Sequence, residues 1–103
     1  MNQAMARAHR EAYMAAMQGG VAVHATGAER VRNRDSHYRF RPDSDFWYLS
    51  GFSEPDAVAV LRPDADTERY VLFVRPRDPE KEVWNGRRAG VDGAREQYGA
   101  DAA

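Results

Sequence analysis

The spacing of apolar and polar residues predicts a helix followed by a short strand in the first part of the chain. Residues 2–18 are rich in alanine and end before Gly19-Gly20. Asn2 is a favourable N-cap and glycine readily takes the positive φ that ends a helix, so we expect a helix over this range. Residues 20–25 are apolar on both faces, which is typical of a buried strand.

Three further apolar runs predict strands, and the polar, arginine-rich residues 26–45 predict a loop before them. Residues 46–49 are an aromatic run, and residues 57–61 and 70–74 flank a turn-forming acidic segment, which indicates a hairpin. Because the hairpin strands are nearly continuously apolar, we expect helices on both faces of the sheet. Short helical segments are expected over 80–84 and from Asp92, as the cap, to Tyr98.

Composition excludes several classes of protein. The chain has 103 residues, a formal net charge of -1 and no cysteine, so it is one domain of modest size or a piece of one, without disulfides or thiolate metal sites. No apolar run approaches the ~20 residues of a membrane span, and the first ten residues lack the apolar stretch of a signal peptide. We therefore expect a cytoplasmic protein with no membrane partner.

The residues alone reveal no self-contained catalytic set. The histidines His9, His24 and His37 do not match a metal-ligand spacing, and no nucleophile or phosphate-binding motif is present. Arginines interleaved with aromatics over residues 30–41 could contact nucleic acid, but the slightly acidic chain lacks the basic footprint of such proteins. We therefore expect no nucleic-acid partner.

One segment carries a family resemblance. Residues 43–57 read D-S-D-F-W-Y-L-S-G-F-S-E-P-D-A, which resembles the run S-D-F-W-Y-L-T-G-F-x-E-P-x-A of the N-terminal domain of Xaa-Pro aminopeptidases (aminopeptidase P), in the creatinase and prolidase superfamily. Four other stretches resemble that domain in the same order: 10–20, the D-S-x-Y pair at 35–38, L-F-x-R-x-R-D at 72–78 and W-x-G-x-R at 84–88. The resemblance therefore covers nearly the whole chain.

The resemblance implies an α/β fold, with a mixed β-sheet flanked by helices. Residues 1–103 would form part of that N-terminal domain, truncated at its C-terminal end, with the pita-bread catalytic domain absent. In the family, the catalytic domain holds two metal ions, usually manganese, and a metal-bridging hydroxide cleaves the bond before a penultimate proline. None of those ligands lies in the N-terminal domain, so we expect this chain alone to be inactive.

The resemblance also implies what the N-terminal domain does. It forms homo-oligomer contacts and helps to shape the mouth of the active site, partly from a neighbouring subunit. Two substrate-binding candidates match family residues near that mouth, Asp35 and Trp84. Trp84 could pack on the proline ring of a peptide substrate, and Asp35 could pair with an arginine or a substrate amine. Simple packing of Trp84 and a loop-capping role of Asp35 are equally compatible with the sequence.

Two alternatives stay open beside this interpretation. The chain could be a standalone interaction or dimerisation module without peptidase activity, or the N-terminal part of a proline dipeptidase or creatinase relative. The run W-Y-L-S-G-F-S-E-P at 47–55 favours the aminopeptidase branch. Physical chemistry adds one expectation beside the resemblance: Arg75, Arg77 and Asp78 can form a charge-assisted network at the end of a strand.

Overall fold

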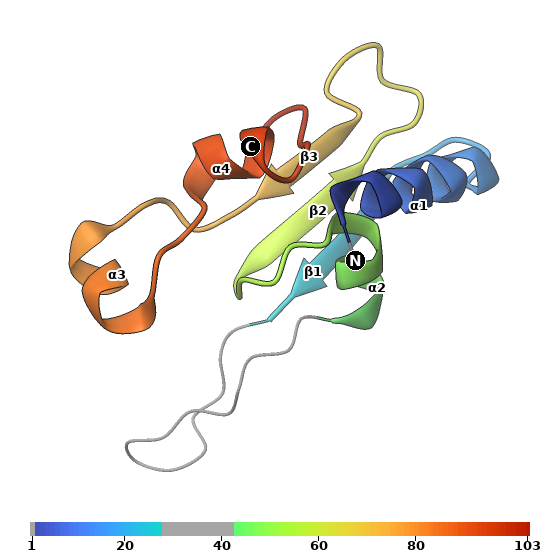
Figure 1. Cartoon of the computed structure of the whole chain (residues 1–103). Coiled ribbons are helices and arrows are strands. Elements are labelled where there is room, and N and C mark those ends of the chain that lie inside the picture. The colour runs from blue at the N-terminus through green and yellow to red at the C-terminus, as the bar shows by residue number, and fades with distance from the viewer. Residues whose placement is uncertain (1, 28–42) are drawn as a thin grey trace.

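The computed structural model describes residues 2–27 and 43–103 as a small sheet with helices packed on it (Figure 1). Most of the predicted loop over 26–45 lies outside the described residues; its two ends belong to a strand and a helix. The elements in chain order are α1 (Gln3–Ala16), β1 (Ala22–Thr26), α2 (Ser44–Ser50), β2 (Ala57–Leu61), β3 (Tyr70–Phe73), α3 (Pro79–Asn85) and α4 (Gly90–Glu96).

The first helix, α1, confirms the prediction over residues 2–18. The Oδ1 atom of Asn2 accepts a hydrogen bond from the backbone N–H of Met5 at 2.9 Å, so Asn2 is the expected N-cap. The buried residues Ala6, Arg10 and Met14 recur every four positions and therefore share one face of the helix. That face includes a buried arginine, which the apolar pattern does not predict.

The three strands form one sheet in the order β1-β2-β3, with both pairs antiparallel. The predicted hairpin is confirmed, with Leu61 opposite Tyr70 and Val58 opposite Phe73. Ala102 makes a parallel bridge to Val71, which adds a parallel contact at the β3 edge and gives the mixed sheet that was expected. The chain thus returns to the sheet after α4.

Two expectations about the strands are wrong within the described part of the chain. The first strand is half exposed, not buried, because β1 lies at the sheet edge and Val23 is 63% exposed. Helices pack on one face of the sheet, not on both, since side chains from α1, α2 and α4 join the same core cluster. The core residues are Met14, Phe46, Leu49, Phe52, Ala57, Ala59, Leu61, Tyr70, Leu72, Ala94 and Ala100.

The opposite sheet face is apolar and open. It carries Val23, Val58, Val60, Val71 and Phe73, which follow from the strand register as the alternate positions to the core residues. Phe73 is 55% exposed, and the three valines of β2 and β3 are half-buried. We call these five residues the open face.

The aromatic run at 46–49 is helical, so the predicted strand is wrong. The Oδ2 atom of Asp43 accepts hydrogen bonds from the N–H groups of Asp45 and Phe46, both at 3.1 Å, and Gly51 ends the helix with φ +65°. These caps at both ends override the strand preference of aromatic residues. Phe46, Leu49 and Ser50 are buried at helical spacing, while Trp47 and Tyr48 are exposed.

The last two helices differ in how well the sequence predicts them. A helical segment over 80–84 is confirmed as α3, whereas α4 begins at Gly90 instead of after a cap at Asp92. Asp92 lies in the first turn, and Ala89 occupies the N-cap position without a side-chain bond. Gly90 has φ +69°, and a Cβ there would lie 2.6 Å from the Cγ of Arg77, so this junction requires glycine.

Candidate functional site

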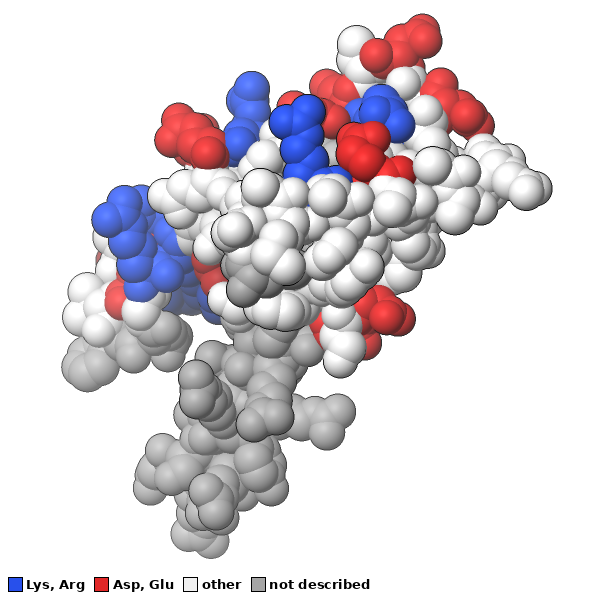
Figure 2. Space-filling model, turned by 45° about the vertical axis from the view of Figure 1, so that its right-hand side comes forward, with Lys and Arg blue, Asp and Glu red and all other residues white. Residues whose placement is uncertain are grey.

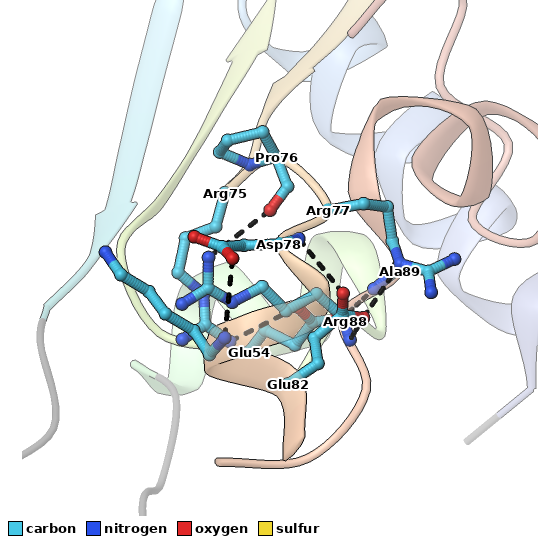
Figure 3. Close-up of polar contacts among 9 residues, drawn as sticks. Glu54, Arg75, Pro76, Arg77, Asp78, Glu82, Arg88 and Ala89 are labelled. Atoms are coloured by element: carbon cyan, nitrogen blue, oxygen red, sulfur yellow. Dashed lines mark hydrogen bonds and ion pairs between the residues drawn. The ribbon is translucent and has the colours of Figure 1, made fainter. Parts of the chain in front are cut away.

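A connected group of charged side chains surrounds α3 and the loop that follows it, residues 86–89 (Figure 3). It combines residues from the segment before β2, the segment between β3 and α3, α3 itself and the loop after α3. We call it the α3 cluster; its members are Glu54, Arg75, Arg77, Asp78, Glu82 and Arg88.

The helix α3 is short and is capped at both ends. Asp78 is its N-cap, with Oδ1 accepting from the N–H of Lys81 at 3.4 Å, and Pro79 occupies the first helical position, where no N–H is needed. Glu82 reaches back, and its Oε2 accepts from the N–H of Asp78 at 3.0 Å, in the manner of a capping box. Gly86 follows the helix with φ +90°.

Glu82 joins the two ends of α3. Its Oε1 accepts from the N–H of Arg88 at 2.7 Å and from the Nε of Arg77 at 2.7 Å. The hydrogen bond from Arg88 lowers the pKa of Glu82 below its ordinary value; desolvation opposes this, and Arg77 and Asp78 reinforce it. The glutamate is therefore held as an anion by donors on both sides of the helix.

Glu54 anchors the same loop to the sheet. Its Oε2 accepts from the N–H of Ala89 at 2.9 Å, and its Oε1 pairs with the guanidinium of Arg75 at 3.3 Å. Arg88 is 8% exposed and its guanidinium donates to the carbonyl of Pro76 at 3.3 Å. The carboxylates of Glu54 and Glu82 thus take two successive backbone N–H groups, which fixes the path of the loop.

The prediction of charge-assisted hydrogen bonds by Arg75, Arg77 and Asp78 is confirmed in part: each side chain makes such a bond, but with other residues and not with one another. The two glutamates that bind the arginines come from outside the strand end. Glu82 stands four residues after Asp78 in a D-P-x-x-E run. That spacing is the sequence signal that could have predicted the hydrogen bond from the Asp78 N–H to the Glu82 carboxylate. Glu54 has no local signal, because its partners lie 21 and 35 residues away.

The structure places one of the two substrate-binding candidates. Trp84 lies in the last turn of α3, two residues after Glu82 and two before Gly86. Asp35 lies outside the described residues. The α3 cluster therefore fixes the backbone on both sides of Trp84.

Two of the three histidines take part in packing contacts. The ring of His9 stacks on Tyr48 with centroids 3.7 Å apart, and the Nε2 of His24 lies 3.0 Å from the hydroxyl of Tyr13. Over residues 2–27 and 43–103, no three His, Asp or Glu side chains lie close enough to hold a metal ion. The helices in this part are also too short or too polar to cross a membrane.

An open cleft of about 690 Å³ lies between α1, the segment joining β2 to β3 and the residues after α4. Arg10 lies beneath it, donating to the carbonyl of Leu49 at 2.9 Å with its guanidinium 4.1 Å above the Tyr70 ring. Burial raises the pKa of Tyr70 to about 12, against the opposing effect of Arg10. Side chains of both signs line the cleft, among them the ion pair of Arg69 with Glu11, and Figure 2 shows acidic and basic residues intermingled along one margin of the molecule.

The fold and the α3 cluster together define an α/β domain that positions a loop, with no metal-ligating group of its own in the described ranges. Residues 6–103 match the family model described as Aminopeptidase P, N-terminal domain. The chain therefore belongs to the aminopeptidase P family, as its N-terminal domain.

Individual relatives agree with this assignment. The chain is 48% identical over 96 residues to the Xaa-Pro aminopeptidase of Escherichia coli, and 49% identical over 75 residues to that of Haemophilus influenzae. These alignments cover 91% and 73% of this chain, and 22% and 17% of the two relatives.

Solved structures extend the match to the whole chain. Aminopeptidase PepP of Pseudomonas aeruginosa superposes with a TM-score of 0.94 at 47% identity, and aminopeptidase P of E. coli in its low-pH form with 0.90 at 43% identity. Both cover 100% of this chain, which spans 24% of each of theirs. The chain thus spans about a quarter of the length of these proteins.

Proposed function

We propose that this domain serves a Xaa-Pro aminopeptidase, a peptidase that releases the N-terminal residue before a proline, and that it does so without catalytic groups of its own. Its part is to form contacts between subunits and to shape the mouth of the active site. The family match and the anchoring of the loop after Trp84 support this role.

The metal belongs to another part of such an enzyme. No group of three His, Asp or Glu side chains in residues 2–27 and 43–103 could hold an ion, so this part of the chain does not fit the manganese pair expected in the family. We propose that the pair is bound by a catalytic domain outside this chain, and that the enzyme is cytoplasmic. The expected result for the isolated chain with manganese and an Xaa-Pro peptide is no turnover above background.

Trp84 contributes an apolar surface in this proposal. An indole packed on a prolyl ring is worth about 1–2 kcal/mol, or roughly 5- to 30-fold in affinity. Because this contact is made before and during the reaction alike, its loss would raise KM and change kcat little. Asp35 supplies a carboxylate for an arginine across the interface or for the substrate amine.

The proposal is tested on the complete enzyme, encoded by this reading frame and its continuation. Trp84→Ala is expected to raise KM for an Xaa-Pro peptide about tenfold with kcat within twofold. Trp47→Ala is the matched control, since Trp47 is an exposed tryptophan on α2. Equal KM values for the two variants, or a reading frame that stops without a metal-binding domain, would overturn the proposal.

The role across subunits has its own test. Subunits carrying Trp84→Ala are mixed and reassembled with subunits whose downstream metal ligands have been replaced. If Trp84 reaches a neighbouring active site, mixed oligomers contain intact sites with low KM. A KM in the mixed oligomers no lower than that of Trp84→Ala alone would show that Trp84 acts only within its own subunit.

A further inference from the structure

We infer that Glu82 and Glu54 are positioning residues for Trp84: together they set the orientation in which the end of α3 is presented to the peptide. This inference rests on the proposed function and deepens it. Neither glutamate needs to touch substrate, because Glu82 holds the backbone on both sides of Trp84 and Glu54 holds it at Ala89.

The helix α3 is too short to be stable by itself. It has seven residues, Pro79–Asn85, and an isolated helix of that length is unstable in water. Its described side chains contribute no member to the hydrophobic core cluster. The contacts of its described side chains include the three hydrogen bonds of Glu82, which join α3 to the segments before and after it.

The polar contacts around α3 converge on two carboxylates, those of Glu82 and Glu54. Glu82 takes three donors, the N–H groups of Asp78 before the helix and of Arg88 after it, and the Nε of Arg77. Its side chain is only 8% exposed, so water cannot readily replace these donors. Glu82 therefore links the start of α3 to the loop that follows it, so that helix and loop form one unit.

Glu54 connects this unit to the rest of the domain. It stands between α2 and β2, and its carboxylate takes the N–H of Ala89 and the guanidinium of Arg75 (Figure 3). The loop of residues 86–89 is therefore held from the helix by one glutamate and from the sheet by the other. Trp84 lies between the backbone held at Asp78 and the backbone held at Arg88 and Ala89.

The test compares amide variants in the complete enzyme. In Glu82→Gln, one oxygen becomes an NH2 group, which faces a donor instead of accepting from it. We expect KM for an Xaa-Pro peptide to rise about fivefold with kcat within twofold, since charged hydrogen bonds are among the stronger ones. Glu54→Gln is expected to act in the same direction. Glu80→Gln is the matched control, because Glu80 is an exposed glutamate on the same helix.

A second readout separates positioning from general damage. With 5-fluorotryptophan, the Trp84 resonance is assigned by its loss in Trp84→Ala, and Glu82→Gln is expected to shift or broaden it while the Trp47 resonance stays in place. Combining Glu82→Gln with Trp84→Ala is expected to add nothing to the KM of Trp84→Ala alone.

The outcomes distinguish this inference from the proposed function. If Trp84→Ala raises KM but neither glutamine variant does, the inference fails and the proposed function stands. Additive effects of Glu82→Gln and Trp84→Ala would also overturn it, because Glu82 would then act by another route. If Trp84→Ala leaves KM unchanged, the proposed function fails, whatever the fluorine spectrum shows.

Discussion

Replacing Ser50 by alanine tests how α2 is joined to the segment after it. The Ser50 hydroxyl donates to the carbonyl of Phe46 at 2.7 Å and accepts from the N–H of Phe52 at 3.0 Å. All three residues are completely buried. No water reaches this hydroxyl, so its removal leaves the Phe52 N–H without an acceptor.

The cost of Ser50→Ala follows from that missing acceptor. A buried, unpaired N–H costs about 1–3 kcal/mol, while burying a methyl in place of a hydroxyl recovers a part of it. We expect the free energy of unfolding to fall by about 2 kcal/mol, which at this chain length lowers Tm by about 8–16 °C.

The assay is urea unfolding followed by circular dichroism, with Ser53→Ala as the control. Ser53 is exposed and stands three residues further along the same segment, so its loss is expected to change stability by less than about 0.5 kcal/mol. The midpoint of Ser50→Ala should fall with the m-value unchanged. A stability within 0.5 kcal/mol of the Ser53→Ala control would refute the hydrogen-bond argument.

Three further predictions concern the caps, the acid response and the open face. Asp43→Ala removes the α2 cap and is expected to cost about 1 kcal/mol in urea unfolding; no change would contradict the assigned cap. Arg88 lowers the pKa of Glu82 in the folded state. The Glu82 carboxylate therefore stabilises the fold fully above the ordinary pKa of 4.5, and this stabilisation is lost as the pH falls through the lowered pKa of the folded state. The midpoint gap between wild type and Glu82→Gln should therefore shrink below pH 4.5, and a constant gap would contradict this reasoning. Phe73→Thr is expected to reduce binding of an apolar dye at unchanged stability, and equal dye binding would show that the open face does not take it up.

Local signals predicted most of the regular structure. The helix over 2–18 begins at its N-cap, Asn2, and is followed directly by Gly19-Gly20. The two hairpin strands are neighbours in sequence. The strand predicted for the aromatic run at 46–49 was wrong. Its residues favour strands, but the caps at Asp43 and Gly51 make the segment helical. All four residues of that run are apolar, so the helical spacing of its buried positions becomes visible only in the structure.

The candidate site was less accessible to sequence reasoning. A family resemblance drew attention to Trp84, and charge chemistry to Arg75 and Arg77, but their acceptors come from other parts of the chain. The pairing of Glu54 with the loop of residues 86–89 depends on how the sheet and α3 come together, which no local pattern encodes. Asp35 lies outside the described residues, so its role stays a prediction.

The structure gives a physical reason why the run at 43–57 and the charged segment at 72–88 occur together. The first half of that run builds α2 through its caps, and four residues after Ser50 the same segment supplies Glu54. Glu54 then binds Arg75, which follows β3, and Ala89, which follows α3. Residues 43–57 therefore both pack α2 on the core and hold the loop of residues 86–89 after Trp84. A change that disturbs α2 should for this reason alter the presentation of Trp84, even though the two helices are far apart in sequence.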